Sequence, residues 1–267
     1  MLRFIFKRLL GMIPVLWIIA TLTFFLIRLA PGGPFDTDKQ VPEDILKNLQ
    51  AKYHMDEPLY SQYFRYLGNL AHGDLGPSFR YANRSVNEII GETFPVSAVV
   101  GFAGLVYALF LGVMSGALAA SKPNSLRDYI PMTLSMLGIC MPSFVIGPLI
   151  VMLFAIKLGW FNVSGWSEPK DIVLPAITLG TIYAAYFSRL TRGGLLEVVR
   201  QDYIRTAHAK GLPGWLIMLK HTLKGGLLPT VSFMGPAIAS MLTGSLVVEL
   251  IFNIPGLGRF FVQSAFE

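Results

Sequence analysis

Five long stretches of the sequence contain no charged residue. They cover 9–27, 93–121, 129–156, 172–188 and 225–248, and together they hold 117 of the 267 residues. Charged residues make up 14% of the chain. At that frequency random placement would put about 16 charges into these stretches, yet they hold none. A helix on the surface of a soluble protein needs a polar face, and these stretches lack one over the roughly 20 residues that cross a bilayer. The pattern excludes a soluble or disordered chain and predicts an all-α polytopic membrane protein.

The segments between these stretches alternate in net charge along the chain. Segments 1–8, 122–128 and 189–224 together carry +9, whereas 28–92, 157–171 and the tail from 249 together carry −3. Basic residues accumulate in cytoplasmic loops of membrane proteins, so we expect the N-terminus and the 189–224 segment to be cytoplasmic. The basic excess is therefore a topology signal and no sign of nucleic-acid binding.

The charge pattern divides the chain into three parts. Residues 1–27 form a cytoplasmic N-terminus and a first span, which we interpret as a retained signal anchor because no A-x-A site follows. Residues 28–92 form an extracytoplasmic cap or interfacial layer, and residues 93–267 form the transmembrane core. Within 28–92 we expect a helix over 42–53, a second helical pattern over 59–70, and a capping box at Ser85 and Glu88.

Prolines and glycines within the spans predict kinked, closely packed helices. The prolines concerned are Pro14, Pro95, Pro131, Pro142, Pro148, Pro175, Pro229 and Pro236. Gly112 and Gly116 form a G-x-x-x-G step, which favours an intramolecular packing contact over a dedicated dimer motif.

Chemistry-bearing motifs are absent from the sequence. There is no P-loop, no H-E-x-x-H and no G-x-S-x-G, the four histidines lack ligand spacing, and Cys140 is the single cysteine. We therefore expect no catalytic residue and no metal site. The spans hold no ionisable relay of the kind that proton-driven carriers use. A pore or carrier remains, either energised by a partner or acting alone as a secondary carrier or channel for small solutes.

The 189–224 segment has the pattern of two short helices and a sharp corner. A helical pattern runs over 195–210, Gly211 suits the residue after its end, and Pro213 prevents continuation. A second helix is expected over 215–223. The alternative is an ordinary basic loop held by lipid headgroups.

The 249–259 segment reads ELIFNIPGLGR, in which proline and glycines interrupt an apolar stretch. We expect an extracytoplasmic re-entrant or gate segment, with a simple interfacial turn as the alternative. Its gate candidates are Phe252, Pro255, Gly256 and Gly258. Candidates for lining a pathway, or for packing, are Ser143, Thr178, Tyr183, Ser188 and Ser240.

Four motifs occur in order along the chain. The main one is D-Y-I-R-T-A-H-A-K-G-L at 202–212, followed by His221, Leu223 and Pro229. The others are R-L-A-P-G-G-P-F-D at 28–36, H-G-D-L-G-P-S at 72–78, and E-L-I-F-N-I-P-G-L-G at 249–258. Together they resemble one family, the ABC-importer permeases of the oligopeptide/dipeptide/nickel branch, and its oligopeptide members in particular. The 202–212 motif is similar to the EAA loop of that family, and Arg205-Thr206 and Lys224 depart from the broader EAA pattern.

The resemblance implies a type I ABC importer transmembrane domain, with a sixth span expected beyond Glu267. It implies a multi-pass subunit of the bacterial cytoplasmic membrane that holds no cofactor itself. Expected partners are a second homologous permease, two ABC ATPases that bind ATP and Mg, an extracytoplasmic peptide-binding protein, and membrane lipid. Cargo stays open between oligopeptide, dipeptide, nickel complex and glutathione, and the 72–78 segment favours oligopeptides. The implied ATPase-docking residues are Asp202, Tyr203, Arg205, Thr206, Ala207, Ala209, Lys210, Gly211 and Leu212.

Overall fold

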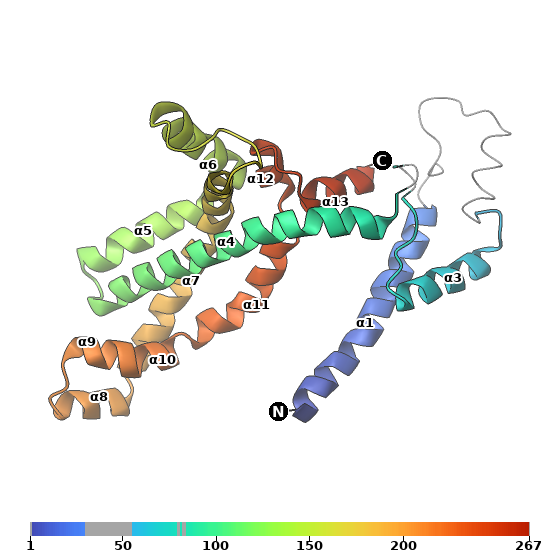
Figure 1. Ribbon diagram of the computed structural model, residues 1–267. Coiled ribbons are helices and arrows are strands. Elements are labelled where there is room, and N and C mark those ends of the chain that lie inside the picture. The colour runs from blue at the N-terminus through green and yellow to red at the C-terminus, as the bar shows by residue number, and fades with distance from the viewer. Residues whose placement is uncertain (1, 30–54, 79–80, 82–83, 267) are drawn as a thin grey trace. The chain divides into compact units, whose positions relative to one another are not determined.

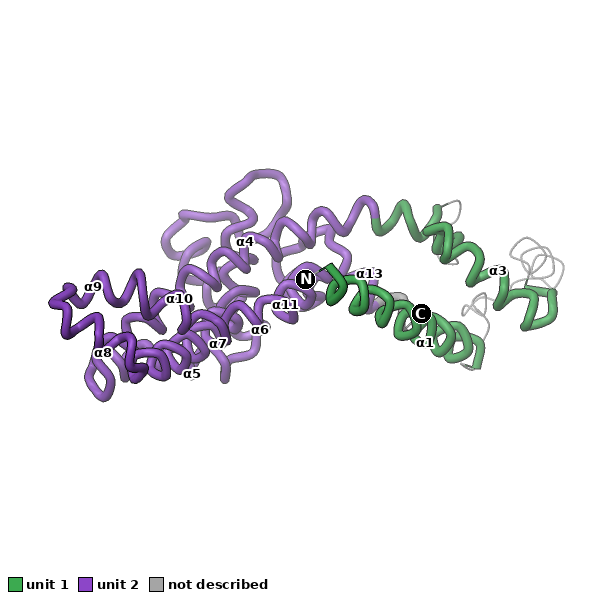
Figure 2. Tube along the Cα trace, turned by 90° about the horizontal axis from the view of Figure 1, so that it is seen from below, with its two compact units in different colours: residues 1–90 green, residues 91–267 purple. Residues whose placement is uncertain are grey.

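The computed structural model describes residues 2–29, 55–78, 81 and 84–266. The chain divides into two compact units, residues 1–90 and residues 91–267 (Figure 2). Apart from an isolated bridge between Pro77 and Ser85, the regular structure of the described residues is helical.

Unit 1 contains α1 (Leu2–Leu29), α3 (Leu59–Ala71) and the start of α4 (Val86–Ser121). Aromatic rings join α1 to α3: the centroid of the Phe24 ring lies 5.3 Å from that of Tyr63 and 5.5 Å from that of Tyr66. Arg28 lies over the Phe24 ring and donates two hydrogen bonds to Gln62. The helical pattern predicted over 59–70 is confirmed, whereas the helix predicted over 42–53 lies outside the described residues.

The H-G-D-L-G-P-S segment of unit 1 forms a turn fastened to the first residues of α4. The side chain of Asn87 accepts a hydrogen bond from the Leu75 N–H and donates one to the Gly73 carbonyl. The Val86 N–H donates to the Gly76 carbonyl. The predicted capping box is present, because Ser85 and Glu88 each accept a hydrogen bond from the other's backbone N–H at 3.1 Å.

Unit 2 consists of helices that are long in the spans and short between them (Figure 1). Beyond Gly91 of α4, its elements are α5 (Leu126–Cys140), α6 (Ser143–Ile150), a π-helical turn (Val151–Lys157), a 3₁₀ turn (Pro169–Ile172), α7 (Val173–Val199), α8 (Asp202–Ala209), α9 (Gly214–Leu216), a second π-helical turn (Ile217–Thr222), α10 (Leu223–Gly226), α11 (Leu228–Leu242), α12 (Leu246–Ile251) and α13 (Leu257–Phe266).

The described helices provide up to five candidate membrane spans, as predicted. Three are the unbroken helices Leu2–Leu29, Val86–Ser121 and Pro169–Val199. The other two are bent pairs, one turning by 110° between Cys140 and Ser143 and one by 52° between Gly226 and Leu228. Pro142 lies in the first break, where its missing N–H ends the preceding helix. The helix of the fifth apolar stretch ends before residue 248, the limit of that stretch. It stops at Leu242, and Gly244 then adopts a positive φ of 87°.

Glycines on α4 allow close approach of α7. A Cβ at Gly112 would lie 2.5 Å from Phe187 Cβ, and one at Gly116 would lie 2.5 Å from the Ser188 carbonyl oxygen. Contacts this short are sterically forbidden, so both positions need glycine. The G-x-x-x-G step therefore makes the predicted intramolecular packing contact.

The predicted single helix over 195–210 is wrong. Residues 195–199 belong to α7, the chain breaks at Arg200 and Gln201, and α8 then runs over Asp202–Ala209. Charges at Arg189 and Arg192 end the apolar stretch but do not end the helix, because long basic side chains extend along a helix to reach the interface. The re-entry helix predicted over 215–223 is present within a continuous helical run, Gly214–Gly226.

Candidate functional site

The helix α8 ends in a sharp corner of the predicted kind. Gly211 has a φ of 74°, which glycine adopts without strain. Its N–H donates to the His208 carbonyl at 2.9 Å, and the Leu212 N–H donates to the Ala207 carbonyl at 3.3 Å. These two bonds are those of a Schellman motif, which satisfies the last carbonyls of the helix. The corner that follows α8 is therefore defined by backbone bonds.

One face of α8 packs inside the unit. Ile204 and Ala207 are buried against Ile217 of the following π-helical turn, and Leu212 packs on the same cluster. Ala207 thus supports the helix pair from within. The other predicted docking residues are exposed, apart from the half-buried Leu212: Asp202, Tyr203, Arg205, Thr206, Ala209, Lys210 and Gly211.

A close helix crossing holds the α8 end of unit 2. A Cβ at Gly194 of α7 would collide with the Gly226 carbonyl of α10, and one at Gly226 would lie 2.9 Å from Leu195 Cα. The two backbones therefore touch, and α8 begins at Asp202, eight residues after Gly194. The structure shows α8 and α9 together at this end of the unit (Figure 1).

At the other end of the unit, Glu249 of α12 is a buried carboxylate with 3% exposure. Its Oε1 accepts a hydrogen bond from Ser97 Oγ of α4 at 2.7 Å, and its Oε2 accepts one from the Arg259 N–H of α13 at 3.0 Å. Ser97 Oγ in turn accepts the Leu257 N–H at 2.8 Å. The first N–H groups of a helix favour a nearby negative charge. Glu249 and Ser97 therefore join α4, α12 and α13 in one polar cluster, which we name the Glu249 cluster.

Glycines make room for this carboxylate. A Cβ at Gly244 would lie 2.5 Å from Glu249 Oε1, one at Gly258 would lie 3.0 Å from Oε2, and one at Gly256 would collide with the carboxyl carbon. The helix break predicted between Glu249 and Arg259 is present, because α12 ends at Ile251 and α13 begins at Leu257. Of the four gate candidates, Phe252, Gly256 and Gly258 are buried and Pro255 is exposed.

Comparison with known proteins assigns the chain to a family. The family model described as "Binding-protein-dependent transport system inner membrane component" matches residues 108–267, and the model of the N-terminal region of such membrane components matches residues 1–100. The chain belongs to this family.

The permease has relatives along nearly its whole length. It is 49% identical to the oligopeptide transport system permease protein OppB of Haemophilus influenzae and 48% identical to that of Escherichia coli K12, over 99% of this chain and 87% of each relative. It is 42% identical to the dipeptide transport system permease protein DppB of Bacillus subtilis, over 99% of this chain and 86% of the relative.

A solved structure shares its fold. A crystal structure of an amino acid ABC transporter with histidines aligns with a TM-score of 0.50 at 16% identity, over 67% of this chain and 79% of that chain. The chain is thus an all-α, multi-pass inner-membrane protein with the type I ABC importer fold and is a permease subunit of an ABC transporter.

An ion pair of the permease was not predicted from its sequence. Arg192 of α7 donates two hydrogen bonds to Asp128 of α5, from Nε at 2.5 Å and from Nη2 at 2.7 Å. The Asp128 side chain is 1% exposed, and its Oδ2 also accepts the Asn124 N–H at 3.0 Å. A bidentate pair of this kind fixes orientation as well as distance. The available signal was that Asp128 directly precedes the 129–156 stretch and Arg192 lies four residues after the 172–188 stretch, both on the side predicted to be cytoplasmic.

The predicted pathway residues separate into two groups. Thr178 and Ser188 are fully buried in helix packing, where Ser188 bonds to Ser115 of α4 at 2.8 Å. Ser143, Tyr183 and Ser240 lie together around a cavity. Among the described residues, no three His, Cys, Asp or Glu side chains come together as a metal site.

Proposed function

We propose that this permease is one of two homologous subunits that form the pathway of an ATP-driven peptide importer, with oligopeptides as its cargo. The support is the set of relatives named oligopeptide permeases, at 47–49% identity over 99% of the chain. A dipeptide permease is also similar, at 42% identity. Oligopeptide relatives are thus the more similar of these two kinds. A peptide-binding protein delivers the cargo from outside.

Energy reaches this subunit through α8 and the corner at Gly211. The observation that carries this proposal is a short helix with one buried face and one polar exposed face, ended by backbone bonds and held at a glycine crossing. Such an element moves as a rigid body when a partner pulls on it. Two partner ATPases bind ATP and Mg and hydrolyse ATP, and each binds an α8-type segment in a groove.

The orientation follows from the charges. The N-terminus and the 189–224 segment face the cytoplasm, where the ATPases are, and the 28–92 segment and the Glu249 cluster face outward. The gate candidates around Phe252 then lie on the side from which peptide arrives. Rocking of the permease pair opens the pathway alternately to each side.

Co-purification and uptake test the proposal together. A second permease and a pair of ATPases are expected to co-purify with the tagged permease. In proteoliposomes whose lumen corresponds to the cytoplasmic side, the complex is expected to accumulate trialanine only when ATP is in the lumen and the binding protein is outside. Accumulation by this chain alone, without ATP or partners, would contradict the proposal and indicate a carrier that works by itself.

A further inference from the structure

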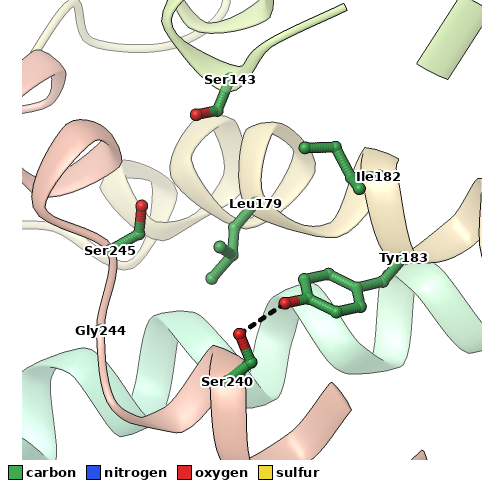
Figure 3. A pocket seen from close by; sticks show the side chains of 7 residues that line it. All are labelled: Ser143, Leu179, Ile182, Tyr183, Ser240, Gly244 and Ser245. Atoms are coloured by element: carbon green, nitrogen blue, oxygen red, sulfur yellow. Dashed lines mark hydrogen bonds between the residues drawn. The ribbon is translucent and has the colours of Figure 1, made fainter. Parts of the chain in front are cut away.

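A polar cavity lies within unit 2, among the bundled helices. It has a volume of about 230 Å³ and is lined by Ser143, Leu179, Ile182, Tyr183, Ser240, Gly244 and Ser245 (Figure 3). The lining comes from α6, α7, α11 and the turn between α11 and α12. The sites that hold whole drug-sized ligands are larger, at about 300–1,000 Å³. This cavity therefore suits part of an extended chain.

Two breaks in the helices create the cavity. The 110° bend before α6 brings Ser143 to the first position of a new helix, away from the axis of α5. The positive φ of 87° at Gly244 turns the chain after α11, so that Ser245 reaches the cavity from another side. Both breaks occur where proline or glycine prevents a regular helix.

The lining combines hydroxyl groups with aliphatic side chains and carries no charge. Four hydroxyls are present, from Ser143, Tyr183, Ser240 and Ser245. Tyr183 donates its hydroxyl proton to Ser240 Oγ at 2.7 Å, which leaves the Tyr183 oxygen as an acceptor and Ser240 with its own O–H to donate. A serine O–H of this set can donate to a carbonyl and a hydroxyl oxygen can accept from an N–H, so the set can pair with either half of a peptide bond.

We propose that this cavity binds the main chain of a passing peptide. A peptide bond that leaves water must find other hydrogen-bond partners, because an unpaired amide inside a membrane protein costs several kcal/mol. Hydroxyls on α6, α7 and α11 supply such partners without reading the cargo's side chains, while Leu179 and Ile182 contact its apolar parts. The inference rests on the proposed function and adds where, and by which groups, the peptide is held.

Thiol labelling of the assembled transporter tests occupancy. Since Cys140 is the single cysteine of the chain, Cys140→Ser gives a background in which Ser240→Cys or Ser245→Cys reports on the cavity. Ser232→Cys is the matched control, because Ser232 is an exposed serine on α11 outside the cavity lining. With trialanine, binding protein and ATP, N-ethylmaleimide is expected to label the two cavity cysteines at least threefold more slowly and the control unchanged. Equal rates with and without peptide at both cavity positions would overturn the inference.

Uptake of a modified peptide tests the chemistry. The variant Tyr183→Phe/Ser240→Ala removes two hydroxyls and is expected to slow trialanine uptake about three- to tenfold, the usual effect of losing hydrogen bonds. The control Tyr186→Phe/Ser232→Ala, on the same two helices, is expected to leave uptake unchanged. For trialanine with a methylated central amide, which lacks that N–H, the cavity variant is expected to lose less than for trialanine itself. An identical loss for both peptides would contradict main-chain recognition.

The two proposals fail in different ways. If the wild-type complex takes up no trialanine with ATP and binding protein, both the proposed function and this inference fall. If uptake is normal and the cavity variants behave like their controls, the permease function stands and the cavity is a packing void.

Discussion

At the residue scale, Glu249 shows how a buried charge is accommodated. Both carboxylate oxygens have a donor, one from Ser97 and one from the backbone of Arg259. Glycines at 244, 256 and 258 leave space for the group. Because each oxygen is satisfied, the cluster stabilises the junction of α4, α12 and α13.

Removing this carboxylate should destabilise the permease. Glu249→Ala leaves the Ser97 hydroxyl and the Arg259 N–H without their acceptor, which costs about 1–3 kcal/mol for each buried group. We expect a lower midpoint in the thermal unfolding of the purified complex in detergent. The unfolding midpoint of Glu249→Gln, which keeps one acceptor oxygen, should fall between those of wild type and Glu249→Ala.

The control is Glu197→Ala on the exposed face of α7, where a change in unfolding free energy within about 0.5 kcal/mol is expected. Equal midpoints for Glu249→Ala and Glu197→Ala would contradict the role of the cluster.

Sequence patterns predicted some residues well and missed others for a physical reason. Gly211 was predictable because a glycine followed by proline after a helical pattern is a local signal, and the structure has it at a positive φ. The role of Glu249 was not predictable, because its hydrogen-bond partners, the Ser97 hydroxyl and the Arg259 N–H, meet it only after folding. From sequence alone Glu249 marks the end of an apolar stretch.

At the element scale, the glycine pair on α7 offers a matched test of helix crossing. Gly194 touches the backbone of α10, whereas a Cβ at Gly193 would meet no atom within 4 Å. Gly194→Ala should therefore cost about 1–3 kcal/mol or more, through displaced backbone. Gly193→Ala should be neutral or stabilising by up to about 1 kcal/mol, because alanine is the better helix former. Thermal unfolding of the two variants checks this, and a Gly194→Ala protein as stable as Gly193→Ala would refute the crossing.

The ion pair between α5 and α7 should couple these helices. A double-mutant cycle with Asp128→Asn and Arg192→Gln is expected to show an interaction energy of about 1–3 kcal/mol, because Asp128 is buried and the pair is bidentate. The control cycle uses Asp202 and Arg205, whose side chains are 94% and 76% exposed. Exposed pairs of this kind contribute about 0–1 kcal/mol. Additive effects at Asp128 and Arg192 would show that the pair does not join the helices.

Helix ends were the weakest sequence-based predictions, and α7 shows why. The apolar stretch ends at Ser188, but the helix continues to Val199 because packing against α5 and α10 stabilises it beyond the apolar part. The five spans were predictable since a charge-free stretch reports membrane burial directly. The 110° bend between α5 and α6 was indicated only as a kink at Pro142, because its angle depends on the helices packed around it.

At the scale of the whole molecule, α7 extends from the region beside α8 to the polar cavity of unit 2. Its 27 residues give a length of about 40 Å at 1.5 Å per residue. At one end α7 contacts α10, beside α8. There the Thr191 hydroxyl of α7 is hydrogen-bonded to the Thr230 hydroxyl of α11, with 2.9 Å between the two oxygens. Further along, Leu179, Ile182 and Tyr183 line the polar cavity. Movement of α8 would therefore reach the cavity through one continuous helix.

We propose that an ATPase drives this permease through α8 and its corner. Gly211→Asp tests this proposal. Aspartate tolerates a positive φ, so the corner still folds, but the variant places a negative charge at the end of α8, on the exposed face that we propose for docking. Gly214→Asp is the control, since it adds the same charge at the start of α9, where a Cβ meets no atom within 4 Å and the helix dipole favours an acid.

The measurement is ATP hydrolysis stimulated by binding protein, alongside trialanine uptake, in proteoliposomes that contain equal amounts of inserted permease. We predict that Gly211→Asp loses both stimulated hydrolysis and uptake, and that Gly214→Asp retains both. Wild-type stimulation and uptake in the Gly211→Asp complex would show that the ATPase does not act through α8 and its corner.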